Sequence, residues 1–231
     1  MKAVKIIILS FVGLFIFLVL FGLLAPETEY EANIKKQKVQ DSIEQAEKLA
    51  EQKKIDAAIF EKNVRIVDSL KKDFLFEEDE FNDQVWINHK RFGKYWPNRN
   101  ALVVYIRKDG SYYLQSNYHG SDWVFHQNIK VKLGNDVITS ENINTFDKRH
   151  KTDLSGGDVW EVNQYTNNSP DVAKAIAHYT GKEPVKVRFQ GEQNIEDFTL
   201  SSRDKKAIEE SIIFAEALQN TWNKIGGPTI P

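Results

Sequence analysis

The chain contains no cysteine, and this absence excludes several kinds of chemistry at once. Without thiols there can be no disulfide, no thiolate nucleophile and no zinc or iron–sulfur cluster held by cysteine. A strong charge of either sign is also missing, because 31 Lys and Arg residues face 33 Asp and Glu residues, for a formal net charge of −2. The overall charge therefore does not by itself indicate a strongly charged polymeric partner.

Catalytic and nucleotide-binding motifs are lacking as well. The five histidines form neither an HExxH motif nor a helical pair at i and i+4, and no Gly-x-Ser-x-Gly elbow, P-loop or Gly-x-Gly-x-x-Gly turn is present. We therefore expect no catalytic residue, no metal site and no cofactor. Asp122 and Glu161 are the one carboxylate pair that we weigh as acid and base for sugar cleavage, although Asp122 is more simply a turn residue.

One long apolar run stands near the amino terminus, where residues 6–25 carry no charge. As a helix, these residues would span about 30 Å, the thickness of a bilayer's hydrocarbon core. The run predicts an uncleaved signal-anchor transmembrane helix over residues 1–25, and a cleaved signal peptide is the alternative. Lys2 and Lys5 favour a cytoplasmic amino terminus. The prediction is a single-pass protein of the cell membrane whose carboxyl-terminal domain is extracytoplasmic, or a secreted one after cleavage.

A helical stalk is predicted over residues 26–75. Thr28 and Glu31 have the spacing of a capping box, and no Gly or Pro interrupts residues 28–75. Apolar residues recur at helical spacing to form a thin seam: Ile34, Ile43, Ala46, Ala50, Ala57, Val64, Val67 and Leu70. One long helix and two helices hinged near Lys53 and Lys54 are both compatible with this pattern. The seam resembles a weak coiled coil, which would make a weak homo-oligomer, or else the stalk lies on its own domain.

Residues 76–223 form the predicted globular domain, in which apolar residues alternate with polar ones as in strands with one buried face. Residues 102–106 and 111–118 read as a hairpin around Asp109-Gly110. Further strands are predicted at 123–126, 129–133, 137–139 and 159–162, with a polar loop over 140–157.

Two helices frame the last strands. Ser169 and Pro170 can begin the first helix and Gly181 can end it, with Ala173, Ile176 and Ala177 facing inward. The strand 185–189 precedes a loop that places Arg188 opposite Asp197 and Lys186 opposite Thr199. Ser201 caps the closing helix, whose first turn holds Asp204 and whose buried stripe consists of Ile208, Ile212, Ala215, Leu218 and Trp222. Residues 224–231 form a flexible tail.

The predicted fold class is α+β: an amino-terminal transmembrane helix, a helical stalk, and a mainly antiparallel sheet or sandwich-like domain with two helices near the carboxyl terminus.

Several short motifs of the globular domain carry a resemblance. They are Gly120-Ser121-Asp122-Trp123 with Phe125, Gly157 with Trp160-Glu161, and Arg188-Phe189-Gln190-Gly191 followed by Asp197 and Thr199. With Trp86 and the Glu216-Ala217-Leu218 segment, they make residues 74–218 similar to an uncharacterised family of bacterial and phage proteins that usually carry a signal peptide, a membrane anchor or another amino-terminal module. The resemblance implies domain boundaries and leaves activity open. Asn194 and Ile195 stand where members of the family tend to have tyrosines.

The best binding candidate in the sequence is the cluster of cations and aromatics formed by Lys90, Arg91, Lys94, Tyr95 and Trp96. Such a mixture stacks on bases or sugars, or lies at a lipid headgroup surface. The alternative is an inter-strand loop whose aromatics cover the sheet and whose cations pair with the acidic run 76–83.

The sequence therefore predicts a non-enzymatic interaction or scaffold domain of the cell envelope, with an envelope protein or a glycan as partner and no nucleic acid. The alternative is an envelope hydrolase of glycans or peptides with a dispersed carboxylate and histidine site.

Overall fold

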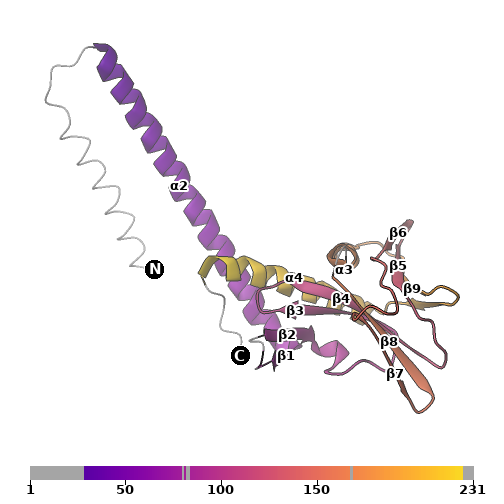
Figure 1. The fold of residues 1–231 in the computed structure, drawn as a ribbon. Helices are drawn as coiled ribbons and strands as arrows, with labels where there is room; N and C mark the ends of the chain where they lie inside the picture. Colours follow the sequence, from indigo (N-terminus) through magenta and orange to yellow (C-terminus); the bar gives the residue numbers. More distant parts are fainter. Residues whose placement is uncertain (1–28, 80, 82–83, 167–168, 226–231) are drawn as a thin grey trace. The chain divides into compact units, whose positions relative to one another are not determined.

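The computed structural model describes residues 29–79, 81, 84–166 and 169–225 (Figure 1). Within these ranges, no helix is both long enough and apolar enough to cross a membrane. The fold class predicted from sequence, with a transmembrane helix at its start, is therefore wrong for the described chain. Residues 6–25, on which that prediction rests, lie outside the described residues, so the cellular location remains a prediction.

The first described element is α2 (Glu29–Leu70), one continuous α-helix of 42 residues (Figure 1). Ion pairs between side chains one turn apart stabilise this helix on its surface. In one of them Lys48 Nζ lies 2.6 Å from Glu44 Oε1. The seam is mostly exposed at its amino-terminal end, at Ile34 and Ile43, whereas Val67 is buried. The structure gives no support to a coiled coil, and self-association remains a prediction.

The chain falls into two compact units, of which one ends at Asp56 and the other begins at Ala57. The boundary thus lies inside α2, whereas the sequence placed it at residue 75. None of the side chains of residues 33–56 is buried. All described strands, and every described helix other than α2, belong to the second unit.

The larger sheet of that unit has six strands in the order β1-β2-β3-β4-β8-β7, and every neighbouring pair is antiparallel. The strands are β1 (Phe74–Asp79), β2 (Gln84–His89), β3 (Ala101–Arg107), β4 (Tyr112–Gly120), β7 (His150–Ser155) and β8 (Asp158–Tyr165). The predicted hairpin around Asp109-Gly110 is confirmed by the pairing of β3 with β4. Gly110 is needed there, since its φ is +81° and a Cβ would lie 2.5 Å from the Ala215 carbonyl oxygen.

The smaller sheet has four antiparallel strands in the order β10-β9-β5-β6. They are β5 (Asn128–Leu133), β6 (Asp136–Thr139), β9 (Lys186–Gln190) and β10 (Ile195–Thr199). The predicted register is confirmed, because Arg188 pairs with Asp197 and Lys186 with Thr199. The Arg188 guanidinium donates two hydrogen bonds of 2.7 Å to the Asp197 carboxylate.

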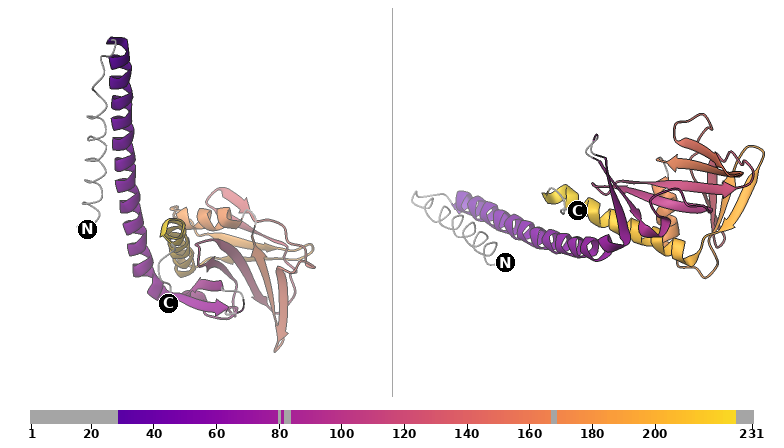
Figure 2. Two further views of the ribbon diagram at one scale, coloured as in Figure 1. Left: turned by 60° about the vertical axis from the view of Figure 1, so that its left-hand side comes forward. Right: turned by 90° about the horizontal axis from the view of Figure 1, so that it is seen from below.

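Two α-helices and two short 3₁₀ turns complete the second unit (Figure 2). They are α3 (Ser169–His178), α4 (Ser202–Ile225), η1 (Lys71–Asp73) and η2 (Lys90–Phe92). Helix α3 packs beside α4 and against β4, while α4 lies on β2 and β3. The predicted inner faces are confirmed at these buried side chains: Ala173, Ile176, Ala177, Ile208, Ile212, Ala215 and Leu218. The side chain of Trp222, also predicted to face inward, lies outside the described ones. The amide of Asp204 donates to the Ser201 hydroxyl at 3.1 Å, as predicted for the cap.

The inner faces of both sheets and helices share one core. Phe214 of α4 stacks on Phe74 of β1 at a centroid distance of 4.4 Å. Phe189 of β9 meets the ring edge of Tyr118 of β4 at 5.7 Å. The smaller sheet is thereby fixed to the end of β4, where the candidate site lies.

Two local predictions are wrong. Residues 150–155 form strand β7 instead of part of a loop, and residues 123–126 form a loop instead of a strand. β7 is an edge strand with mostly exposed polar side chains, so it has no alternating apolar pattern. The apolar residues of the 123–126 segment suggested a strand, but hydrogen bonds from their backbone amides to the Glu161 side chain hold the segment as a loop.

Candidate functional site

Three segments that are distant in sequence meet beyond the end of β4. They are residues 121–127, which we name the aromatic loop, strand β8 at Glu161, and the turn after β9 at Gly191. Gly191 lies against the loop so closely that a Cβ there would come within 2.0 Å of the Val124 carbonyl oxygen. These segments contain much of the motif set that carries the family resemblance. The structure thus gathers residues that the sequence shows as scattered.

Glu161 is the residue that holds the aromatic loop. Its carboxylate accepts hydrogen bonds from three consecutive backbone amides, those of Val124 (2.6 Å), Phe125 (2.8 Å) and His126 (2.9 Å). The His126 Nδ1 lies 3.0 Å from Glu161 Oε2. Both side chains are fully buried. A buried carboxylate is tolerated when hydrogen bonds replace its water, and here backbone amides supply most of them.

The protonation of this pair follows from its surroundings. Burial alone would raise the pKa of the Glu161 carboxyl, but the hydrogen bonds from His126 and from the loop amides outweigh it and hold the pKa below its ordinary value. Burial lowers the pKa of His126, against the smaller opposing effect of Glu161. An ionised Glu161 and a neutral His126 result. His126 then donates a hydrogen bond through Nδ1 and accepts one at Nε2 from the Ser116 hydroxyl, at 2.8 Å.

Ser116, His126 and Glu161 have the order of hydrogen bonds found in acyl-transfer triads. However, all three side chains are fully buried, and Ser116 Oγ is also within 3.2 Å of the Tyr165 hydroxyl. A nucleophile must reach a substrate carbonyl, and this hydroxyl faces the protein interior. The arrangement therefore acts as a support for the loop.

Phe125 has a strained backbone. Its φ is 49°, and among the described residues it is the only non-glycine residue with positive φ. A bulky residue adopts this conformation only when its surroundings impose it, and such strain gathers at ligand-binding positions. The Phe125 ring is 48% exposed and lies parallel to the Trp123 ring, with a centroid distance of 5.2 Å and an interplanar angle of 6°. Trp123 in turn packs on the core.

Polar side chains belong to the same neighbourhood. Asn194 Nδ2 donates to the Trp123 carbonyl at 3.1 Å, and Gln127 Nε2 donates to Glu192 Oε1 at 3.0 Å. Asp122 is exposed, and its carbonyl accepts the Tyr118 hydroxyl at 2.7 Å. The aromatic loop thus presents a rigid ring close to exposed amide and carboxylate groups.

The predicted cluster of Lys90, Arg91, Lys94, Tyr95 and Trp96 lies mostly at the surface, and its binding role remains a prediction. Lys90 Nζ donates to the Lys72 carbonyl at 2.5 Å, and Arg91 Nε donates to Asp204 Oδ1 at 2.9 Å. Tyr95 is highly exposed, whereas Trp96 is half-buried. Arg99, which follows the cluster, also donates to the Asp204 carboxylate, with two hydrogen bonds of 2.9 Å. Arg91 of the predicted cluster therefore helps to hold the start of α4.

The predicted acid–base pair is not a working one in this geometry. Glu161 is buried and its oxygens are engaged by amides, while Asp122 is exposed. The described residues contain no group of three His, Cys, Asp or Glu side chains arranged for a metal ion.

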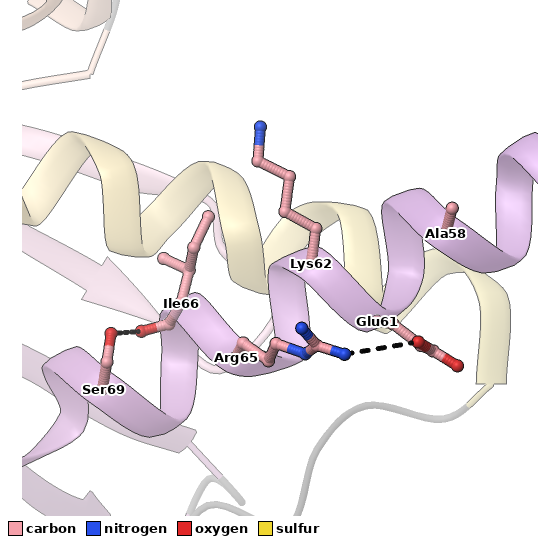
Figure 3. A pocket seen from close by; sticks show the side chains of 6 residues that line it. All are labelled: Ala58, Glu61, Lys62, Arg65, Ile66 and Ser69. Carbon is pink, nitrogen blue, oxygen red and sulfur yellow. Dashed lines mark hydrogen bonds and ion pairs between the residues drawn. The ribbon is translucent and has the colours of Figure 1, made fainter.

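A cavity of about 600 Å³ lies along α2 and is lined by Ala58, Glu61, Lys62, Arg65, Ile66 and Ser69 (Figure 3). All six residues belong to one helix. The Arg65 guanidinium and the Glu61 carboxylate pair at 3.6 Å, and the Ser69 hydroxyl donates to the Ile66 carbonyl. Because no second element contributes side chains, no chemistry converges there.

Comparisons with known proteins returned no match: no family model fits the chain, and no curated protein or solved structure is significantly similar to it. The family resemblance of residues 74–218 therefore remains a prediction.

Proposed function

We propose that the second unit is a non-enzymatic binding domain that takes a glycan on the aromatic loop. The observation that carries this proposal is the left-handed backbone of Phe125, whose amide is held by a fully buried carboxylate while its ring is exposed. The strain is maintained by three hydrogen bonds from backbone amides to the Glu161 carboxylate and by the close approach of Gly191. A loop built in this way loses little conformational freedom on binding.

The chemistry around the ring favours a sugar. A pyranose presents C–H groups on its face and hydroxyls at its edge, so it fits a flat aromatic surface with amide and carboxylate groups nearby. Phe125 supplies the surface, and the exposed side chains of Asp122, Glu192 and Asn194 supply hydrogen-bonding groups.

The test compares Phe125→Asn with wild type. Asn tolerates positive φ, so the variant removes the ring and keeps the loop conformation. We expect wild-type protein to bind chitohexaose or cellohexaose in isothermal titration calorimetry, with a change in tryptophan fluorescence from Trp123. We expect Phe125→Asn to weaken binding about tenfold or more, the loss of about 1.4 kcal/mol or more.

Phe146→Asn is the matched control, since Phe146 is 95% exposed and lies outside the aromatic loop. Its affinity should equal that of wild type. Equal binding by the Phe125→Asn variant, or no binding of either oligosaccharide by wild type, would overturn the proposal.

A further inference from the structure

The outer face of the smaller sheet concentrates positive charge. Lys130 and Lys132 of β5 point away from the core that Ile129, Val131 and Leu133 fill, and Lys186 and Arg188 of β9 do the same beside Val187 and Phe189. We name Lys130, Lys132, Lys186 and Arg188 the basic face. Asp197 is the acidic residue that the register places on this face, and it pairs with Arg188.

The register of the basic face works against stability. Lys130 lies directly opposite Arg188, and Lys132 lies directly opposite Lys186. Like charges directly opposite one another on a sheet are destabilising. Within the described chain, Lys130, Lys132 and Lys186 form no ion pair that would offset this repulsion. Among the described residues of this face, the four cations share one carboxylate, that of Asp197, which pairs with Arg188 and also attracts Lys186. A face that breaks a local pairing rule twice and keeps an excess of positive charge indicates a functional surface.

This face is also hollowed. A cavity of about 480 Å³ lies over it, lined by the four cations together with Val137, Val187, Asp197, Phe198 and Thr199. Its volume is in the range of small-ligand sites, about 300 to 1,000 Å³. Charge repulsion and concavity are independent observations, and both indicate an anionic occupant.

We propose that the basic face binds an acidic polysaccharide, with its carboxylate or other acidic groups on the lysines. Along each strand the cations are about 7 Å apart, and across strands about 5 Å, so repeated acidic groups on one chain can meet several of them. The Thr199 and Thr139 hydroxyls and the Asp197 carboxylate add partners for sugar hydroxyls. This surface is separate from the aromatic loop, and its test does not depend on Phe125.

Other anionic partners fit this face less well. Single-stranded nucleic acid is bound by stacking on several exposed aromatics beside the cations, whereas the one aromatic that lines this cavity is the half-buried Phe198, whose ring stacks on Phe189 of the core. A lipid surface is flat, whereas the basic face is hollow. A ligand whose only polar groups are phosphates has no hydroxyl that could donate a hydrogen bond to the Asp197 carboxylate.

The test uses an octameric oligogalacturonate and its fully methyl-esterified form, which keeps the sugar and removes the charge. We expect wild-type protein to bind the acid more tightly than the ester, with an affinity for the acid that falls as salt rises from about 50 to about 200 mM. The variant carrying Lys130→Gln, Lys132→Gln and Lys186→Gln should bind the acid at least about tenfold more weakly.

A second readout separates lost function from lost folding. Because like-charge repulsion is removed, the triple variant should unfold at a higher temperature than wild type. The control variant carries Lys35→Gln, Lys36→Gln and Lys38→Gln, which removes the same charge from exposed positions of α2. It should bind as wild type does.

Three results would overturn the inference: equal binding of acid and ester, equal binding by the triple variant and wild type, or tighter binding of oligo-dT, poly-glutamate or phosphatidylglycerol vesicles than of the oligogalacturonate. Loss of acid binding in the triple variant alone, with Phe125→Asn unaffected, would support the basic face whatever the outcome at the aromatic loop.

Discussion

Glu161 is a buried anion whose partners are mostly neutral. Its carboxylate is surrounded by three backbone amides and by His126, and no lysine or arginine lies among its hydrogen-bond partners in the described chain. Hydrogen bonds to a charged group contribute about 1.5 to 3 kcal/mol each, which explains how such a group is retained in a core. The loop that carries Phe125 depends on this one side chain.

Glu161→Gln tests that dependence. The amide has one acceptor oxygen in place of two, and its NH₂ group would face backbone N–H donors. We expect the free energy of unfolding to fall by about 3 kcal/mol, measured by urea denaturation. Glu183→Gln, at an exposed position, should change it by less than about 0.5 kcal/mol. If the Glu161→Gln variant were as stable as wild type, the loop amides would not require an ionised partner, and the expected dependence would be wrong.

The same pair predicts how stability depends on pH. The pKa of His126 is lowered on folding by burial, so as pH falls below about 6.5 the unfolded chain takes up a proton before the folded one does, and stability decreases. The pKa of Glu161 is also lowered on folding, so a further loss follows below about pH 4.3. Both groups therefore make the fold weaker in acid.

Urea denaturation at about pH 7 and about pH 5 measures the histidine part of this effect. His126→Gln should be less stable than wild type at the higher pH, and its stability should change less between the two. His178→Gln, at an exposed residue, should keep the wild-type pH dependence. An unchanged pH dependence in His126→Gln would contradict a lowered histidine pKa.

At the scale of single elements, the start of α4 depends on an ion cluster. Asp204 lies in the first turn, where a negative charge is favourable, and its side chain is 5% exposed. Arg91 and Arg99 bring the 90–99 segment onto it. Arg91, one of the cations that the sequence suggested as a binding surface, thus joins two elements.

Asp204→Asn leaves two partly buried arginines without their counter-charge. We expect the free energy of unfolding to fall by about 3 kcal/mol, because removal of one partner of a buried ionic cluster leaves the others uncompensated. Glu216→Gln is the control. The Glu216 side chain is 40% exposed, so its ion pair with Lys174 should contribute less than about 1 kcal/mol to stability. Thermal unfolding measures the loss of stability in both variants. Equal losses in Asp204→Asn and Glu216→Gln would contradict a special role for Asp204.

At the scale of the whole molecule, the helix α2 spans two units. Its residues from Ala57 onward include buried Asn63 and Val67, and Ile66 and Leu70 pack on the core of the second unit. The globular unit therefore includes the last part of α2, which the sequence assigned to the stalk.

Two shortened chains test this division. A chain of residues 57–231 should unfold at the same temperature as residues 29–231, because residues 33–56 bury no side chain. A chain of residues 71–231 should lose about 2 kcal/mol or more of stability, since it exposes the surface that Val67 covers. Equal unfolding temperatures of the two shortened chains would place the boundary at the end of α2.

The sequence by itself determined the elements whose side chains follow a simple period. The hairpin at Asp109-Gly110, the cap at Ser201 and the register of Arg188 with Asp197 all follow from local rules. These features depend on neighbours along the chain or across one turn, and such neighbours can be read from spacing.

Tertiary structure decided what the sequence could not. The apolar residues of 123–126 suggested a strand, but the Glu161 side chain, thirty-five or more residues away along the chain, accepts hydrogen bonds from the amides of residues 124–126 and holds them in a loop. Strand β7 forms because β8 offers it hydrogen bonds, although its side chains remain mostly exposed. The basic face likewise exists only once β5 and β9 pair, since nothing in either segment alone shows that their cations lie opposite one another. Contacts between distant residues, set by packing, overrode local preference at each of these places.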